Sequence, residues 1–149
     1  MKKLLYLFVL FISQLNFAQE KVTIGEIQKI QSKILGTERE IWINLPASYS
    51  DTKLHPAKYP VIYVLDAEDN FTFLTGIVNK FQKGHYQEMP ESIIVGITNK
   101  NGDRTKDFTN HNDKNFLHFI QTELFPFIEK HYRVQDYRLL IGHSLGGYF

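Results

Sequence analysis

The sequence predicts an α/β fold in which a mostly parallel sheet carries helices on both faces. Two short apolar runs, at 61–65 (VIYVL) and 92–97 (SIIVGI), are rich in β-branched residues, as is typical of strands buried on both faces. Helix-length segments at 70–83 and 113–132 follow these runs. Strands that alternate with helices favour right-handed crossovers, and therefore parallel strands.

The N-terminal part predicts an antiparallel hairpin at one edge of this sheet. Between 26 and 46, two strand-like runs flank the letters GTE, which read as a turn. In the second run Ile41, Ile43 and Leu45 alternate with more polar residues, the two-residue period of a half-buried strand. From 46 to 60 the chain is rich in Ser, Asp, Lys and Pro and reads as a loop.

The segment 113–132 has one apolar face of helical spacing. Asp113 is a candidate N-cap, and Pro126 is expected to bend the helix or to end it early. Its aromatic residues are candidates for the core before they are candidates for ligand contact: Phe116, Phe119, Phe125 and Phe127.

The first 18 residues have the layout of a secretory signal. Two lysines precede nine consecutive apolar residues, and the segment closes on Ala18. The apolar run is shorter than the roughly 20 residues that a membrane-spanning helix needs. The alternative, a core helix, would be expected to show a polar face. We therefore expect cleavage near Ala18 and an exported, periplasmic or secreted protein without a stable membrane anchor.

Charge and cysteine content exclude several partners. The formal charge is +1 for the chain, and removal of residues 1–18 takes away two lysines and no acids, which leaves −1. A surface this close to neutral gives no electrostatic reason to expect nucleic acid or anionic membranes as partners. The absence of cysteine excludes disulfides and a lipid-modified cysteine.

A third apolar run, at 138–142, leads into the motif GHSLG at 142–146. A GxSxG motif that follows a strand and opens a helix is typical of a nucleophile elbow, where a strained turn lifts the serine hydroxyl above the sheet. Ser144 is therefore the candidate catalytic nucleophile. The alternative is a glycine-rich turn whose serine is incidental.

Four blocks carry a wider resemblance: REIWINLPASY, YPVIYVLDAEDNF, VGITNKNGDRTKDFT and IGHSLGG. In order and approximate spacing they resemble the putative esterase family of the α/β-hydrolase superfamily, which includes esterase D and enterobactin-type siderophore esterases. The resemblance covers about 26–149. It implies an α/β-hydrolase fold and a serine esterase that forms an acyl-enzyme on Ser144, with no metal and no organic cofactor.

The same resemblance implies two backbone donors for an oxyanion hole, which stabilises the charge that develops on the carbonyl oxygen. The N–H of Leu145, directly after the serine, matches the first donor. The loop LDAEDN places Glu68 at the position of the second, although Ala67 stands where the family often has glycine.

In this fold the acid and the histidine follow the serine along the chain. No histidine follows Ser144 here, and the ring of His143 is not placed at the hydroxyl by adjacency alone. The sequence therefore predicts that 19–149 is the N-terminal part of a single domain, whose acid and base lie beyond position 149. The chain by itself is expected to be inactive.

Arg104 and His143 are candidate contacts for an ester substrate. Arg104 belongs to a block that the resemblance places near the mouth of the site, where it would bind an anionic group or brace the loop through Asp107. The family favours siderophore-type esters; the substrate itself and the oligomeric state are not predicted.

Three other patterns carry less weight. His111 and His118 have no standard metal-ligand spacing, so a solvated loop end is the better interpretation. The letters DAEDN at 66–70 space their acids somewhat like a calcium loop, but the glycine and the distal glutamate are missing. Asn70 begins a formal glycosylation motif.

Two functional alternatives stay open. Within the enzyme class, the acyl group could pass to an alcohol instead of water, which would make the protein an acyltransferase. Outside it, the chain could be a non-catalytic binding protein with an α/β-hydrolase-like fold.

Overall fold

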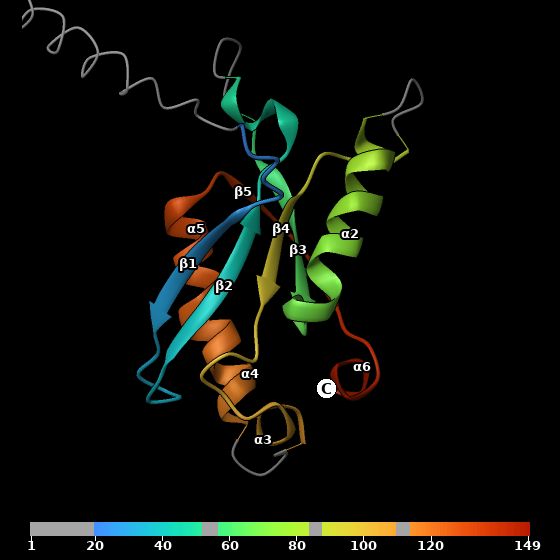
Figure 1. The fold of residues 1–149 in the computed structure, drawn as a ribbon. Helices are drawn as coiled ribbons and strands as arrows, with labels where there is room; N and C mark the ends of the chain where they lie inside the picture. The colour runs from blue at the N-terminus through green and yellow to red at the C-terminus, as the bar shows by residue number, and fades with distance from the viewer. Residues whose placement is uncertain (1–19, 52–56, 84–87, 110–113) are drawn as a thin grey trace, which may run out of the picture.

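The computed structural model describes residues 20–51, 57–83, 88–109 and 114–149 (Figure 1). In chain order the elements are β1 (Glu26–Gln31), β2 (Glu38–Asn44), the 3-10 helix η1 (Ala47–Ser50), β3 (Tyr59–Leu65), α2 (Ala67–Gln82), β4 (Ile93–Ile97), α3 (Arg104–Thr109), α4 (Asn115–Phe119), the π-helix η2 (Ile120–Leu124), α5 (Phe125–His131), β5 (Val134–Ile141) and α6 (Leu145–Tyr148).

The described strands form one sheet in the order β1-β2-β4-β3-β5. β3 runs parallel to both β4 and β5, so these three strands end at the same edge of the sheet. β1 pairs antiparallel with β2, and β2 antiparallel with β4. The predicted parallel sheet with an antiparallel hairpin at one edge is thereby confirmed.

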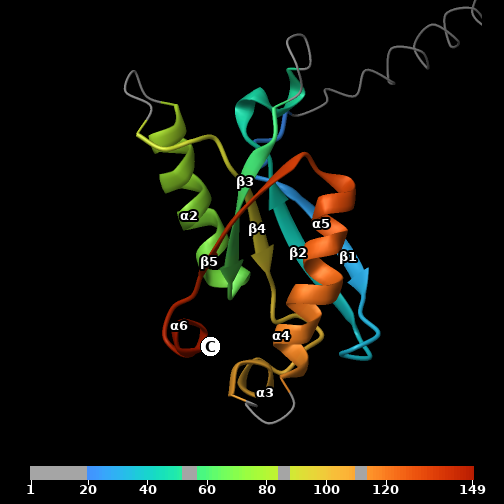
Figure 2. The ribbon, with the colours of Figure 1, turned by 180° about the vertical axis from the view of Figure 1, so that it is seen from behind.

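Helices cover both faces of the sheet (Figures 1 and 2). Alternate residues of β3 explain why, because Ile62 and Val64 pack with Phe71 of α2, whereas Val61 and Tyr63 belong to the core on the other face. That second core includes the α4, η2 and α5 side chains Phe116, Phe119, Ile120, Leu124 and Ile128. β3 and β4 are buried at every position, as their continuous apolar runs predict.

The helical segment after residue 114 does not end at its proline. α4, η2 and α5 follow one another without a gap, and Pro126 lies in the first turn of α5, where proline needs no hydrogen-bond acceptor. A π turn precedes it, so the chain adjusts its winding and continues to His131. Asp113, the predicted cap, lies outside the described residues, and Lys114 occupies the cap position.

Three further differences concern element bounds. α2 begins at Ala67, so the letters DAEDN form a helix start and not a loop. α3 occupies a segment for which the sequence predicted no helix. β5 begins at Val134 and is largely exposed, whereas the prediction was a short strand from 138.

The hairpin strand β2 is also more buried than its alternation predicts, since Arg39 and Glu40 are buried beside Ile41.

None of the helices that the structure describes combines the length and apolarity needed to cross a bilayer.

Candidate active site

Ser144 occupies a strained turn between β5 and α6. Its φ of 54° and ψ of −121° lie in a region that residues with a side chain rarely adopt, at a cost of about 1 to 3 kcal/mol. The turn is closed by the N–H of Gly146, which donates to the His143 carbonyl over 3.0 Å, and by the N–H groups of Gly147 and Tyr148, which donate to the Ser144 carbonyl. Ser144 itself is exposed. This is the geometry that the motif predicts for a nucleophile elbow.

The two glycines that frame the motif are required by close contacts. A Cβ at Gly142 would lie 2.1 Å from the Gly146 carbonyl oxygen, so the end of β5 and the start of α6 meet backbone to backbone. A Cβ at Gly146 would lie 3.1 Å from Oδ2 of Asp66 and 3.5 Å from Cβ of Leu65. The elbow therefore packs directly on the end of β3.

Both candidate oxyanion donors lie in the first turn of a helix at this edge of the sheet. Leu145 is the first residue of α6, and Glu68 is the second residue of α2. The first N–H groups of a helix have no acceptor within the helix. In α2 the carbonyl of Asp66 accepts only from later residues, the N–H groups of Asp69 and Asn70, at 3.1 Å each. The Glu68 N–H thus precedes the N–H groups that donate to the Asp66 carbonyl in the first turn of α2.

Asp66, between β3 and α2, is the centre of the polar contacts beneath the elbow. It adopts a left-handed conformation with φ of 52°, and its carboxylate is buried. Arg104 donates from Nε to Oδ1 over 2.6 Å and from Nη2 to Oδ2 over 2.8 Å, and the Asn99 side-chain amide donates to Oδ1 over 2.7 Å. These hydrogen bonds, first those from Arg104, hold the pKa of the Asp66 carboxyl below its usual value of 3.8, although burial opposes them.

The sequence suggested two roles for Arg104, and its contacts exclude one of them, the bracing of the loop through Asp107. Arg104 does not brace the loop through Asp107, because Asp107 pairs with Arg39, whose Nη1 lies 2.8 Å from Oδ2. Both side chains of that second pair are buried, and the Arg39 guanidinium also lies 5.8 Å from the ring centre of Phe116. The fork of Arg104 is engaged by Asp66, and 38% of its side chain stays exposed. Its contact with substrate remains a prediction.

α3 lies beside α6 at the edge where β3 and β4 end (Figures 1 and 2). The ring of Phe108 in α3 lies 5.6 Å from Phe149, which follows α6, and 5.5 Å from Phe116 in α4. An aromatic contact thus joins α3, α4 and the end of the elbow. The sequence prediction of Phe116 and Phe119 as core residues is confirmed, while Phe125 and Phe127 are partly buried against that core.

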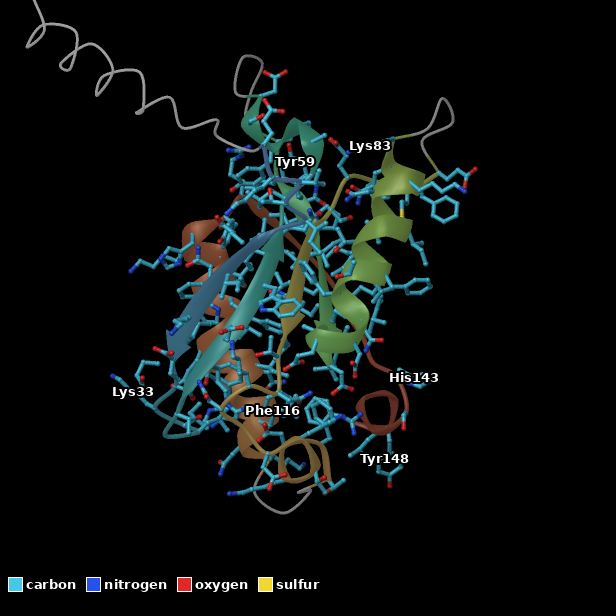
Figure 3. The ribbon with its side chains drawn as sticks, viewed as in Figure 1. Lys33, Tyr59, Lys83, Phe116, His143 and Tyr148 are labelled. Carbon is cyan, nitrogen blue, oxygen red and sulfur yellow. The ribbon has the colours of Figure 1, made fainter. Side chains whose placement is uncertain are left out.

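His143 is exposed beside the serine. It lies at the periphery of the molecule next to α6, as does Tyr148, whereas Phe116 lies inside (Figure 3). Among the described residues, no hydrogen bond joins a histidine ring or a carboxylate to the Ser144 hydroxyl.

The metal alternatives find no support in this part of the chain. The first acid of DAEDN, Asp66, is engaged by an arginine and an amide. Over the residues with described positions, no group of three or more His, Asp or Glu side chains gathers to hold a metal ion. His111 lies outside those residues. Asn70, the formal glycosylation acceptor, donates through its side-chain amide to the Leu65 carbonyl over 3.1 Å.

Sequence reasoning missed the importance of Asp66 and Asn99. The only available signal was position, since both directly follow, or nearly follow, a parallel strand, where the polar groups of α/β sites collect. Asp66 pairs with Arg104 across 38 positions of sequence and with Asn99 across 33, and neither contact has a local signature.

Comparison with known proteins gives consistent matches. The Esterase family, described as "Putative esterase", matches residues 32–149. The ferri-bacillibactin esterase BesA of Bacillus subtilis (strain 168) is 29% identical over 150 residues, which covers 83% of this chain and 50% of that protein. The chain therefore spans about half the length of its curated relative.

Solved structures match in the same region. An IroE-like serine hydrolase from Shewanella oneidensis is similar with a TM-score of 0.75 and 31% identity, over 83% of this chain and 44% of the other. The BES protein from Bacillus cereus gives a TM-score of 0.71 and 30% identity, over 91% of this chain and 57% of the other. These likenesses confirm the predicted α/β-hydrolase fold.

Proposed function

This chain belongs to the Esterase family, and from that premise we propose that the protein is a serine esterase with Ser144 as its nucleophile. The observation that carries the proposal is the conformation of Ser144, a strained residue exposed between two glycines that the packing requires. Strain of this kind persists only where the surrounding structure enforces it, and it gathers at functional sites.

The proposed chemistry is acyl transfer in two steps. The Ser144 Oγ attacks the acyl carbon of an ester, its proton passes to a base, and the bond to the leaving alcohol breaks as that alcohol takes up the proton. Water then attacks the acyl-enzyme and releases the acid and the free serine. The N–H groups of Leu145 and Glu68 would stabilise the oxyanion in both steps, each by about 3 to 4 kcal/mol.

We further propose a small-molecule ester as the substrate, of the siderophore type. The support is similarity, because one relative is named as a ferri-bacillibactin esterase. We assign the base and the acid of this reaction to none of the described residues.

The test is hydrolysis of p-nitrophenyl acetate by the complete protein beside its Ser144→Ala variant. We expect hydrolysis by the parent and a loss of at least 10³-fold in kcat for the variant, with an unchanged melting temperature. A variant that hydrolyses as fast as the parent would remove Ser144 from the chemistry. Binding of the ester without turnover by the parent would favour the non-catalytic alternative, and product esters formed with an added alcohol would favour acyl transfer.

Export is the last part of the proposal. It rests on the signal-like layout of residues 1–18, which lie outside the described residues. Expression of the complete gene in a Gram-negative host should give a periplasmic or secreted product whose N-terminal sequence begins just after Ala18. A product that keeps Met1 and stays in the cytoplasm would contradict it.

A further inference from the structure

Side chains from a distant part of the sequence meet at the carboxylate of Asp66. The segment after β3 supplies Asp66 itself, the segment after β4 supplies Asn99, and α3 supplies Arg104. The fourth neighbour is the elbow, since a Cβ at Gly146 would lie 3.1 Å from Oδ2. Within the described residues, the segments after β3 and β4, the start of α3 and the elbow thus meet at one buried carboxylate.

The same contacts reach the proposed second oxyanion donor. Asn99 donates its side-chain amide to Asp66 and its backbone N–H to Oε1 of Glu68, over 2.9 Å. Glu68 is two residues from Asp66 on the first turn of α2. Its backbone is consequently fixed at one end by the left-handed Asp66 and at the other by its own side chain.

We propose that the Asp66–Arg104 ion pair is a positioning device that sets the Glu68 N–H at its working distance from the Ser144 elbow. This role rests on the serine esterase function proposed above, and it belongs to Asp66 and Arg104 in addition to the nucleophile Ser144. Arg104 suits this role because its planar fork meets both carboxylate oxygens and so fixes orientation as well as distance.

The geometry favours this role over direct binding of substrate by Arg104. Two of its three nitrogens already donate to Asp66, and the guanidinium lies 5.3 Å from the ring centre of Phe108. A guanidinium held by a carboxylate and an aromatic ring is suited to hold a loop in place. Preorganised donors contribute to catalysis only when their position is fixed, and a misplacement of about 1 Å can lower the rate about 10²-fold.

The test uses the complete protein, the neutral substrate p-nitrophenyl acetate, and the variants Arg104→Ala, Arg104→Lys and Asp66→Asn. We expect kcat to fall about 10²-fold in Arg104→Ala with KM changed less than about threefold, because a displaced donor acts in the transition state. Added guanidinium ion should restore part of kcat in Arg104→Ala and none in Arg104→Lys. If Arg104→Ala does not fold, Arg104→Lys carries the test, since it keeps the charge but loses the fork.

Arg133 offers a matched control at the opposite end of the sheet. It also makes two hydrogen bonds, to the carbonyl oxygens of Ala57 and Tyr49, and it lies 4.0 Å from the ring centre of Tyr49. Arg133→Ala should lower the melting temperature and leave kcat unchanged.

Three results would overturn the inference. An Arg104→Ala variant with parental kcat excludes a positioning role, and a rise in KM confined to anionic esters would assign Arg104 to substrate binding. An equal fall in kcat for Arg133→Ala would show a general loss of stability. Failure of the proposed function is distinguishable, because the parent itself would then be inactive or Ser144→Ala would be active.

Discussion

At the scale of single residues, glycines in the elbow and in α2 differ in whether there is space for a side chain. A Cβ at Gly142 would lie 2.1 Å and 2.4 Å from backbone atoms of Gly146, which cannot move aside as a side chain could. Gly76 is exposed in the middle of α2, and no other atom lies within 4 Å of the place where its Cβ would be.

We expect Gly142→Ala to lower the free energy of unfolding of the complete protein by about 1 to 3 kcal/mol, because the added methyl group overpacks the elbow. Gly76→Ala should instead raise it by about 0.5 to 1 kcal/mol, because alanine is the better helix former. Urea denaturation of both variants checks the pair. Equal effects of the two substitutions would contradict the close approach of β5 and α6.

The titration of Asp66 gives a prediction with a defined sign. Its pKa is lower when folded than the usual 3.8, so its contribution to stability is fully present above that value and is lost as the pH falls through the folded pKa. Glu40 acts in the same direction, because hydrogen bonds from Trp42 and then Lys100 lower its pKa from 4.5. Asp66→Asn should therefore reduce the acid sensitivity of the protein without abolishing it.

Acid unfolding followed by circular dichroism measures this effect. The free energies of unfolding of the parent and of Asp66→Asn should differ most near neutral pH and converge as the pH falls below 3.8. The exposed Asp136 on β5 provides a control substitution, Asp136→Asn. A difference that grows towards acid pH would show that the ion pair does not stabilise the folded state.

At the scale of elements, α3 is held by two ion pairs that point to different parts of the fold. Arg104 at its start reaches Asp66 below the elbow, and Asp107 one turn later reaches Arg39 on β2. Both side chains of the second pair are less than 8% exposed, and Nε of Arg39 has no hydrogen-bond partner within the described structure. The burial of both charges opposes the attraction between them, so we expect this pair to orient α3 more than it stabilises the fold.

Removal of one partner should be more harmful than removal of both. We expect Arg39→Met to lower the free energy of unfolding by about 3 to 5 kcal/mol, because it leaves the Asp107 carboxylate buried without a partner. The double variant Arg39→Met/Asp107→Leu should be more stable than Arg39→Met alone. Additive losses in this double-mutant cycle would contradict the coupling.

The elements also show where sequence is informative. β3 and β4 could be predicted because their apolar runs are continuous, and the elbow because its serine, glycines and strand are adjacent. α3 could not, because its six residues hold one buried side chain, Phe108, and its position depends on the ion pairs that Arg104 and Asp107 make with distant segments. The burial of Arg39 could not be predicted for the same reason, because its partner Asp107 lies 68 positions away in the sequence.

At the scale of the whole molecule, the two outer strands of the sheet differ. β1 is short and polar, with Lys29 paired to Glu38 across the hairpin. β5 has β3 as its one neighbour among the described strands and exposes Tyr137, Leu139 and Leu140 by 66%, 41% and 46%. An apolar strand with a free edge is a template for association with other chains.

We therefore expect isolated residues 20–149 to self-associate through β5. Size-exclusion chromatography with light scattering should show oligomers or aggregates, and the double substitution Leu139→Lys/Leu140→Glu should shift them towards monomer. Phe73→Lys is the matched control, because Phe73 is 68% exposed on α2 and away from the strand edge. A parent segment that is monomeric with a sharp melt would contradict the role of β5.

The proposed esterase function depends on Ser144 as the nucleophile, and covalent labelling of the reactive serine tests that role. The complete protein is treated with a fluorophosphonate, which forms a stable covalent adduct with activated serines, and the modified peptide is identified by mass spectrometry. We expect one adduct per chain, on Ser144, formed in step with the loss of p-nitrophenyl acetate hydrolysis. Hydrolysis that continues after Ser144 is fully modified, or an adduct on another serine that abolishes it, would contradict the role of Ser144 as the nucleophile.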